Sequence, residues 1–407
     1  MRSVEEHRAA VLGLVTALAP VEVPVGRALG LVLAADVTAA VDLPGFDNSA
    51  MDGYAVRAAE LVGAGPDAPV LLPVDGDIAA GDTTRHVLRP GHAMRIMTGA
   101  PLPEGADAVV PVEVTDGGAE RVGVRLAPEV GRHLRHRAED VRAGDAVLRS
   151  GTRLGPGHLA LAAAGNVAVV RVHPRPRVTV VSTGDELVAP GSPLEHGQVV
   201  DSNHVMLRAL VEAAGAEVAG AAHLADDATA VRAFLDDLPG SPDLVLTTGG
   251  VSMGVYDTVK EVLTADGGVD FVKVAMRPGM PQGSGVVGSS RTPALTLPGN
   301  PVSSFVSFHV FVLPVLRRLA GLDPAADGSF EAVADASWSG APGKVEFTRV
   351  VERGGRVRPS GGQGSHVLGA LAEATALATV PADVERVERG DVVRCIPLLG
   401  QDRDRGL

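Results

Sequence analysis

The alternation of apolar and polar positions is clearest between residues 174 and 321. Apolar, β-branched runs there predict strands at residues 177–182, 217–221, 243–247, 271–274 and 294–297. Between them, apolar positions recur at helical spacing and predict helices at residues 203–214, 229–238, 256–264 and 301–319. Near-continuous apolar strands that alternate with helices are typical of a mostly parallel sheet with helices on both faces. This region is therefore expected to form an α/β domain.

In the rest of the chain, short apolar runs are broken by glycine and proline, which favours β-rich structure. The N-terminal stretch predicts one amphipathic helix followed by short strands, and the stretch after residue 138 again looks like strand and short-helix material. We expect these two stretches to pair, so that the residues between them form an inserted β-rich domain. The predicted domains are 1–43 with 139–173, 44–138, 174–322 and 323–407, in an α/β and β multidomain chain.

Composition narrows the classes of function. The formal net charge of −13 and the aromatic content of 3% argue against a nucleic-acid partner, which needs a basic face and rings for stacking. The single cysteine, Cys395, excludes an internal disulfide framework and a cysteine-based zinc site.

The chain carries neither a signal peptide nor a membrane span by our interpretation. Glu5 and Glu6 stand where a signal peptide needs basic residues. Residues 301–316 contain several serines and a histidine, and we interpret them as too short and too polar to cross a bilayer. We therefore expect a cytoplasmic protein without a membrane partner.

Polar, glycine-rich loops follow three of the predicted strands, where ligands bind in open parallel sheets. They read STGDE at 182–186, TTGGVSMG at 247–254 and PGNP at 298–301. Gly249 and Gly250 allow the backbone to approach an anion, while Asn300 and Pro301 suit the N-cap and first position of a helix. One such loop is more often an ordinary turn, but three at one edge indicate an anion site.

Two carboxylates, Asp185 and Asp257, follow these loops. Carboxylates beside a phosphate are unfavourable unless a hard cation lies between them, and Mg²⁺ prefers one or two carboxylates together with phosphate oxygens. The nearest candidate cation among the side chains is Lys273. Taken alone, Asp185 fits a turn-capping role equally well, and Lys273 is more often a solvated strand residue.

The predicted inserted domain holds polar strings between apolar runs. FDNSAMDGY occupies 46–54, RIMTGAP occupies 95–101, and Glu139 and Asp140 follow a basic stretch at 132–137. Solvated loops and a charged surface hairpin are the simpler interpretation of each string by itself.

Together, seven strings closely resemble the molybdopterin molybdenumtransferase family, which includes bacterial MoeA and the E domain of gephyrin. They are FDNSAMDGYAV at 46–56, RIMTGAPLPEGADAVVPVE at 95–113, STGDEL at 182–187, DSN at 201–203, TTGGVSMG at 247–254, LPGNPVSS at 297–304 and GGQGSH at 361–366. The strings occur in the order and at the spacing of the family, over nearly the whole chain.

The resemblance implies an elongated, L-shaped subunit of four domains that acts as a homodimer, with a central molybdopterin-binding α/β domain. It implies a reaction in which adenylylated molybdopterin and the co-substrate molybdate give AMP and molybdenum cofactor with Mg²⁺. The site is expected between the central domain of one subunit and the β-rich domain of the other. Molybdopterin adenylyltransferase and apo-molybdoenzymes are further partners to consider.

The family's functional positions can be carried over residue by residue. The catalytic positions are Asp52, Glu139, Asp185, Asp257 and Lys273, of which Asp185 and Asp257 are expected to face the metal. The substrate-binding positions are Thr98, Thr183, Gly184, Gly249, Gly250, Ser252, Arg277, Pro298, Asn300, Pro301 and Ser365. Asp52, Thr98 and Glu139 are expected to come from the partner subunit.

The chain departs from the family's pattern in three places. Arg277 and Met280 stand where the family often has lysines; Arg277 keeps the charge and can grip an oxyanion through two N–H groups, whereas Met280 loses it. Val255 stands where relatives often carry an acid, and Ala138 where they often have glycine. Lower activity would follow, unless a basic residue at 135 or 137 compensates.

Three other functions are weighed against this one. An adenylyltransferase that makes the adenylylated pterin uses a related α/β domain, but it leaves the string at 46–54 without a role. A non-catalytic scaffold is compatible with a gephyrin relative, although all the carboxylates named above are retained. A nucleotide-binding regulator explains only the glycine-rich loops.

Overall fold

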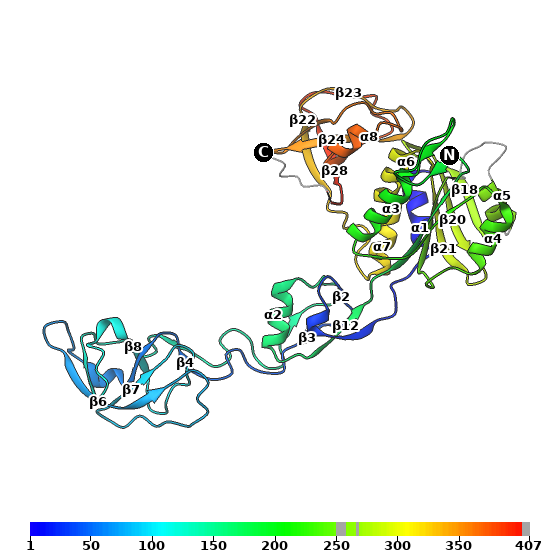
Figure 1. Ribbon diagram of the computed structural model, residues 1–407. Helices are drawn as coiled ribbons and strands as arrows, with labels where there is room; N and C mark the ends of the chain where they lie inside the picture. The colour runs from blue at the N-terminus through cyan, green and yellow to red at the C-terminus, as the bar shows by residue number, and fades with distance from the viewer. Residues whose placement is uncertain (250–257, 266–267, 401–407) are drawn as a thin grey trace.

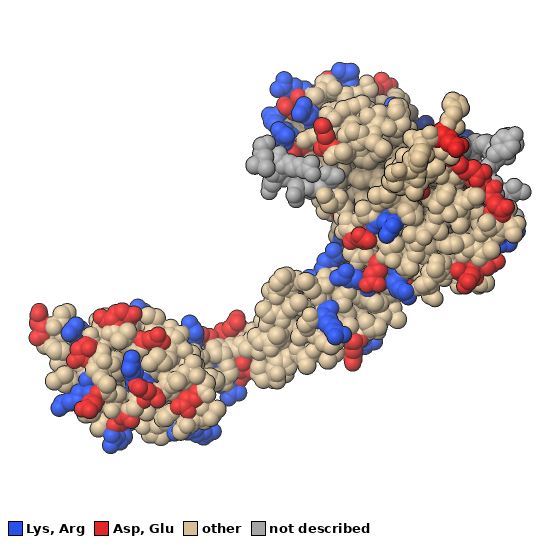
Figure 2. Space-filling view, viewed as in Figure 1, with Lys and Arg blue, Asp and Glu red and all other residues tan. Residues whose placement is uncertain are grey.

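The computed structural model describes residues 1–249, 258–265 and 268–400 (Figure 1). The subunit is elongated and has the outline of an L. A distal lobe, residues 44–138, lies at one end and is joined through a narrow middle section to a central lobe and a C-terminal lobe at the other end. On the face shown in Figure 2, acidic and basic side chains are interspersed over both ends of the molecule.

The central lobe is built on a six-stranded sheet in the order β16-β13-β17-β21-β20-β18. Its strands are β13 (Arg177–Thr183), β16 (Glu217–Leu224), β17 (Leu244–Thr248), β18 (Val269–Lys273), β20 (Pro281–Val287) and β21 (Thr292–Leu297). The first four strands in the order are parallel, as the apolar runs predicted. β20 is antiparallel to both of its neighbours and was not predicted, because its glycines and serine have low strand propensity.

Helices cover both faces of this sheet. α1 (Val4–Leu12), α3 (Ser202–Ala213), α6 (Pro301–Ser307), the π-helical turn η4 (Phe308–Val312) and α7 (Leu313–Leu319) share one core with the sheet. α4 (Ala228–Asp236) and α5 (Thr258–Ala265) share a second core on the opposite face. Val180 of β13 belongs to the first core and Val181 to the second, as the alternation of side chains along a strand requires.

The helical run Pro301–Leu319 is long and apolar enough to be a candidate membrane span, with a mean hydropathy of 1.4. Our expectation that this segment is too short and too polar was therefore wrong. However, 89% of its 18-residue apolar window is buried inside the protein, as in the core helix of a globular lobe.

The middle section consists of strands from before and after the distal lobe. β1 (Val21–Pro24), β12 (Val169–His173) and β2 (Val32–Leu33) form one sheet, and β3 (Val37–Thr38) pairs with β11 (Ala146–Leu148). η1 (Val25–Arg27) and α2 (Pro156–Ala164) complete this section. The expected pairing of the two stretches is present, but α1 packs on the central lobe and not with them.

The chain enters and leaves the distal lobe at one joint. There the Leu43 N–H donates to the Val141 carbonyl at 2.8 Å, and the Ala138 N–H donates to the Pro44 carbonyl at 3.0 Å. The lobe contains a five-stranded sheet, the strand pair β4–β10 and two short 3₁₀ turns. These elements are β4 (Asn48–Ser49), β5 (Gly53–Val56), η2 (Ala58–Leu61), β6 (Val70–Ile78), β7 (Ala93–Ile96), β8 (Ala108–Pro111), η3 (Val112–Val114), β9 (Arg121–Val124) and β10 (Leu134–Arg135).

The C-terminal lobe is a small barrel. β24, β25, β22, β28 and β26 pair in that order, and β26 pairs back with β24. Its elements are β22 (Phe330–Ala334), β23 (Trp338–Ser339), β24 (Val345–Arg353), β25 (Arg356–Pro359), α8 (Leu368–Glu373), β26 (Ala376–Val380), β27 (Arg386–Val387) and β28 (Val392–Pro397). β19 (Met276–Arg277), which leaves the central lobe, pairs with β24 and so joins the two lobes. A further short pair, β14 (Leu187–Val188) with β15 (Val199–Val200), lies outside these sheets.

Candidate functional site

The three polar loops predicted at the carboxyl edge of the central sheet lie side by side. Gly249 has a φ of +91°, and a Cβ placed there would lie 2.6 Å from the carbonyl oxygen of Thr183, so the loops after β13 and β17 touch. A Cβ on Gly299 would lie 3.7 Å from the Cα of Gly249, which places the loop after β21 beside them. Gly250, Ser252 and Asp257 lie outside the described residues.

Asn203, at the start of α3, ties two of these loops together. Its Nδ2 donates to Thr248 Oγ1 at 2.9 Å and to the Gly299 carbonyl at 2.6 Å. Thr248 Oγ1 donates in turn to the Pro298 carbonyl at 3.2 Å, and Ser304 Oγ donates to the same carbonyl. The sequence did not identify Asn203 as a site residue, because its partners lie 45 and 96 positions away along the chain.

Three buried polar atoms at this edge have no hydrogen-bond partner in the described part of the chain. They are Thr183 Oγ1, Thr247 Oγ1 and Asn203 Oδ1. A buried polar group without a partner costs on the order of 1–3 kcal/mol, so such atoms accumulate where a ligand or ordered water completes the structure. At this edge, these three atoms are available for hydrogen bonds to a ligand or to water.

Asp185 is exposed on the loop after β13, and its Oδ1 accepts the N–H of Asp226 at 3.1 Å. The contact brings Asp226, a carboxylate that the sequence did not single out, next to Asp185. Gly184 precedes it with a φ of +147°, a region that favours glycine.

The donors present suit a magnesium ion shared with a phosphate better than a closed protein cage. Within residues 1–249, 258–265 and 268–400, no group of three or more His, Cys, Asp or Glu side chains could hold a metal ion. Mg²⁺ needs only one or two carboxylates when phosphate and water supply its other oxygens. Asp185 meets that requirement, and residue 257 is not described.

The start of α6 lies against the loop 361–366. Asn300 occupies the N-cap position, but its exposed side chain makes no capping hydrogen bond, which corrects the predicted capping role. Pro301 is the first helical residue, as predicted, and the Ser365 carbonyl accepts the N–H of Val302 at 3.3 Å. Ser365, Pro298 and Pro301 are thus brought together.

Arg349 holds the loop that carries Ser365. The side chain is fully buried and donates to the carbonyls of Val367, Gly362 and Gly364 at 2.9, 2.8 and 3.2 Å. No local pattern in the sequence indicated this role, because a buried arginine is recognised only from the carbonyls around it.

Lys273 and Arg277 lie farther along the same side of the central lobe. Lys273 is exposed at the carboxyl end of β18, with β20 and β21 between its strand and β17. Arg277 lies on β19, and its Nη1 is 3.8 Å from Oε2 of the buried Glu346. Burial raises the pKa of Glu346, while the charge of Arg277 lowers it.

The remaining predicted residues lie in the distal lobe and directly after it. Thr98 donates to Asp52 Oδ1 from its backbone N–H at 2.6 Å and from its hydroxyl at 2.8 Å. These two bonds, with the charge of Arg95, lower the pKa of Asp52. Glu139 is exposed just beyond β10, the strand that pairs with β4, and its Oε2 accepts the His136 N–H at 2.8 Å.

Ala138 and the two arginines before it can now be judged from the structure. Ala138 has a φ of +60°, a backbone region that favours glycine. Arg137 donates to Asp42, so it is not a free compensating charge. Arg135, on β10, makes no ion pair with any residue that the structure describes and keeps that hypothesis open.

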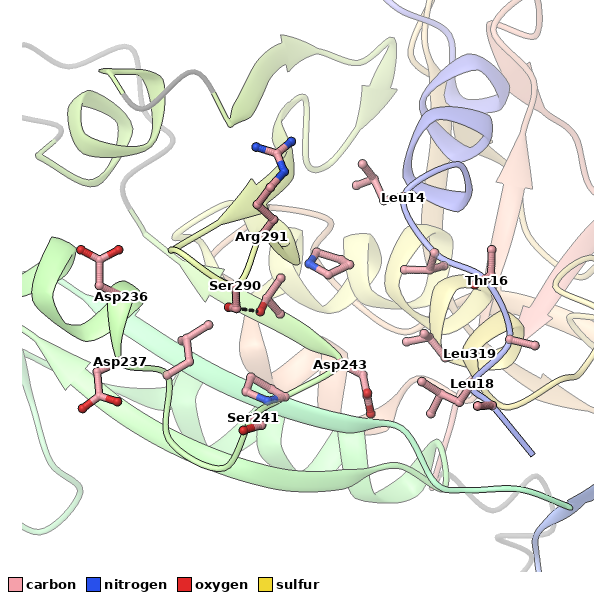
Figure 3. Close-up of a pocket in the computed structure, with 17 residues that line it drawn as sticks. Leu14, Thr16, Leu18, Asp236, Asp237, Ser241, Asp243, Ser290, Arg291 and Leu319 are labelled. Atoms are coloured by element: carbon pink, nitrogen blue, oxygen red, sulfur yellow. Dashed lines mark hydrogen bonds between the residues drawn. The ribbon is translucent and has the colours of Figure 1, made fainter. Parts of the chain in front are cut away.

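A cavity of about 630 Å³ lies at the opposite, amino-terminal edge of the central sheet (Figure 3). It is lined by the segment after α1, by Asp236 and Asp243, and by Ser290 and Arg291. None of the predicted site residues lines it. The polar loops therefore lie at the carboxyl edge of the sheet, whereas this cavity lies at its amino-terminal edge.

The similarity of this chain to known proteins identifies its family. Three family models match in order: the MoeA N-terminal region (domain I and II) at residues 2–165, a probable molybdopterin binding domain at 179–318, and the MoeA C-terminal region (domain IV) at 331–398. The chain is 48% identical over 398 residues to molybdopterin molybdenumtransferase 2 of Mycobacterium tuberculosis, covering 96% of this chain and 98% of the relative. The chain belongs to the molybdopterin molybdenumtransferase family.

Other members of the molybdopterin molybdenumtransferase family agree over most of the length. The molybdopterin molybdenumtransferase of Haemophilus influenzae is 35% identical over 378 residues, which cover 91% of this chain and 92% of the relative. The crystal structure of the molybdopterin biosynthesis MoeA protein from Pyrococcus horikosii matches with a TM-score of 0.81 at 29% identity, covering 98% of this chain and 99% of that one. Membership places the chain among the transferases of molybdenum cofactor biosynthesis.

Proposed function

We propose that the chain inserts molybdenum into molybdopterin, using adenylylated molybdopterin and molybdate and releasing AMP with the help of Mg²⁺. The observation that carries the proposal is the joining of the loops after β17 and β21 by Asn203, with the loop of Ser365 held against the same helix start by Arg349. The buried hydroxyls of Thr183 and Thr247, near the ends of β13 and β17, have no hydrogen-bond partner among the described residues.

In this proposal the loops bind the phosphates and the carboxylates bind the metal. Gly249 keeps the loops after β13 and β17 in contact, because a side chain there would collide with Thr183. Asp185, with Asp257, would hold the ion. When bound, Mg²⁺ neutralises charge on the phosphoanhydride that breaks. Lys273 and Arg277 offer positive charge to molybdate.

The proposal requires a second subunit. Asp52 and Thr98 belong to the distal lobe, at the far end of the L from the central lobe, and Glu139 directly follows this lobe in the chain (Figure 1). In a homodimer, the distal lobe of the partner can complete the site. The ionised Asp52 would then add a carboxylate to the polar edge of the other chain.

The proposal also covers the setting of the reaction. We place it in the cytoplasm, with molybdopterin adenylyltransferase and apo-molybdoenzymes as further partners. The four domains are proposed with the boundaries given by the sequence, except that α1 packs with the central lobe.

Release of AMP from adenylylated molybdopterin, with molybdate and Mg²⁺, tests the function. We expect Asp257→Asn to lower turnover by more than about tenfold, as when a group placed on the reacting charge is lost. Asp236→Asn is the matched control, since Asp236 lines the cavity at the opposite edge of the same sheet. Unchanged turnover in Asp257→Asn would remove that carboxylate from the mechanism, and no AMP release by the wild type would refute the function.

A further inference from the structure

Glu346 is a buried carboxylate for which the structure provides only a loose partner. Its side chain is 6% exposed, and its Oε2 has no hydrogen-bond partner among the described residues. Its ion-pair partner among the described residues is Arg277, whose Nη1 lies 3.8 Å from Oε2, beyond hydrogen-bonding distance. An ionised carboxylate in such a place is costly, so Glu346 depends on Arg277 to remain charged.

The backbone fixes these two residues side by side. β19 and β24 are parallel, and Arg277 is the register partner of Glu346, so the two side chains leave the sheet on the same side. The segment after Arg277 is anchored on α6, since Gln282 Nε2 donates to the Gly279 carbonyl at 2.6 Å and to Ser307 Oγ at 2.7 Å. The position of Arg277 is therefore fixed relative to α6, the helix that begins at the candidate site.

Arg277 retains unused hydrogen-bonding capacity. Its side chain is 56% exposed, and a guanidinium has five N–H donors in one plane. Nη1 faces Glu346, and the exposed part of the plane is open to a tetrahedral oxyanion. The carboxylate and an oxyanion would thus compete for one positive charge.

Among the described residues, Arg277 is the one cation that forms an ion pair with Glu346. Its register partner on β26 is Val380, and its same-face neighbour on β24 is Thr348, neither of which titrates. Arg277 is the group whose charge acts on the pKa of Glu346, against the upward effect of burial.

We infer that oxyanion binding at Arg277 is coupled to the uptake of one proton by Glu346. This inference rests on one part of the proposed function, that Arg277 faces molybdate, and not on the release of AMP. When the oxyanion engages the guanidinium, Glu346 loses its counter-charge and takes a proton from solvent; release of the oxyanion returns the proton. Glu346 is then a positioning residue that weakens the hold of Arg277 on its ligand and favours release.

Titration calorimetry with molybdate as the probe tests the coupling on the full-length protein. Wild type is titrated at several pH values in two buffers of different ionisation enthalpy, because burial raises the pKa of the Glu346 carboxyl above its usual range. We expect net proton uptake and an affinity that rises as pH falls. Glu346→Gln should bind molybdate more tightly by about threefold, the scale of a half-exposed ion pair, without proton uptake.

A double-variant cycle separates the coupling from a general effect on folding. Arg277→Ala should show no proton uptake, and adding Glu346→Gln to it should change nothing further. The inference is overturned if wild type binds molybdate without proton uptake, if wild type binds no molybdate, or if Glu346→Gln acts equally with and without Arg277.

The wild-type measurement does not depend on any variant, so poor folding of Glu346→Gln would leave the test intact. Because binding is measured without turnover, this result is independent of the AMP-release assay. Proton-coupled binding in a protein that releases no AMP would refute the proposed function and leave the inference standing.

Discussion

At the scale of single residues, hydrogen bonds fix the charge of the distal half of the site. Asp52 receives two hydrogen bonds on one oxygen from Thr98, and they are the largest causes of its lowered pKa. The carboxylate is therefore ionised throughout the neutral range. A negative charge held in a fixed orientation is useful only if it meets a cation or a proton of the substrate.

We expect Thr98→Val to raise the pKa of Asp52 and to slow AMP release by about threefold to tenfold, because one of the two donors is lost. Thr98→Ser keeps the hydroxyl and should behave like wild type. Carbon-detected NMR titration of Asp52 and the AMP-release assay measure the two effects. Equal rates in the Val and Ser variants would show that the hydroxyl has no role in turnover.

At the scale of elements, two buried histidines tie the core helix of the central lobe to other segments. His309, in the π-helical turn, donates from Nδ1 to the Phe305 carbonyl at 3.0 Å and accepts the Leu399 N–H on Nε2 at 3.2 Å. The ring of His7, on α1, packs edge-on against the ring of Phe311, with 4.7 Å between the ring centroids. Burial lowers the pKa of each to about 4.

These pKa values predict a loss of stability in mild acid. Between about pH 6.5 and pH 4 these histidines are protonated in the unfolded chain but neutral in the folded chain. The free energy of unfolding therefore falls as pH falls through this window. Each histidine contributes on the order of 3 kcal/mol over the full window. Urea unfolding at several pH values measures the change.

The variant His309→Gln isolates one contribution, because glutamine does not titrate and carboxylates titrate equally in both proteins. We expect the unfolding free energy of this variant to depend less on pH than that of wild type. Parallel pH curves for the two proteins would contradict the assignment of His309.

A comparison of predicted and observed strands shows which of them could be predicted from the sequence alone. The strands of the parallel half were predictable, since β13 is buried continuously from Val178 to Thr183 and so consists of apolar and small residues. β20 was not, because its residues read as a loop and the strand depends on pairing with β21 and β18. Local propensity cannot report such pairing.

Some residues of the candidate site could likewise be predicted from local sequence, and others could not. Glycine-rich loops at strand ends carry a local signal, and Gly249 is where the backbone requires it. Asn203 and Arg349 carry no such signal, because their roles consist of hydrogen bonds to segments distant in sequence. Asn300 shows the converse case, a good capping residue whose side chain does not cap.

At the scale of the whole molecule, the outline of the subunit separates the two halves of the proposed site (Figure 1). Asp52 lies in the distal lobe and Asp185 in the central lobe. A monomer of this shape cannot bring them together, whereas an antiparallel pair of subunits can.

We therefore expect Asp52→Asn and Asp185→Asn to be nearly inactive alone and to complement each other when their subunits are mixed. Random exchange gives one intact site in half of the dimers, so about a quarter of wild-type AMP release should return. Sedimentation checks that the dimer forms. No recovery in exchanged dimers, or a fully active monomer, would refute the shared site.

The joint at Leu43 and Val141 gives the distal lobe a further property. Because the chain enters and leaves at neighbouring backbone positions, the lobe is a cassette whose ends already meet. It can be lengthened, or exchanged for that of a relative, as one piece. Recognition of a partner can then diverge during evolution without any change in the loops of the central lobe.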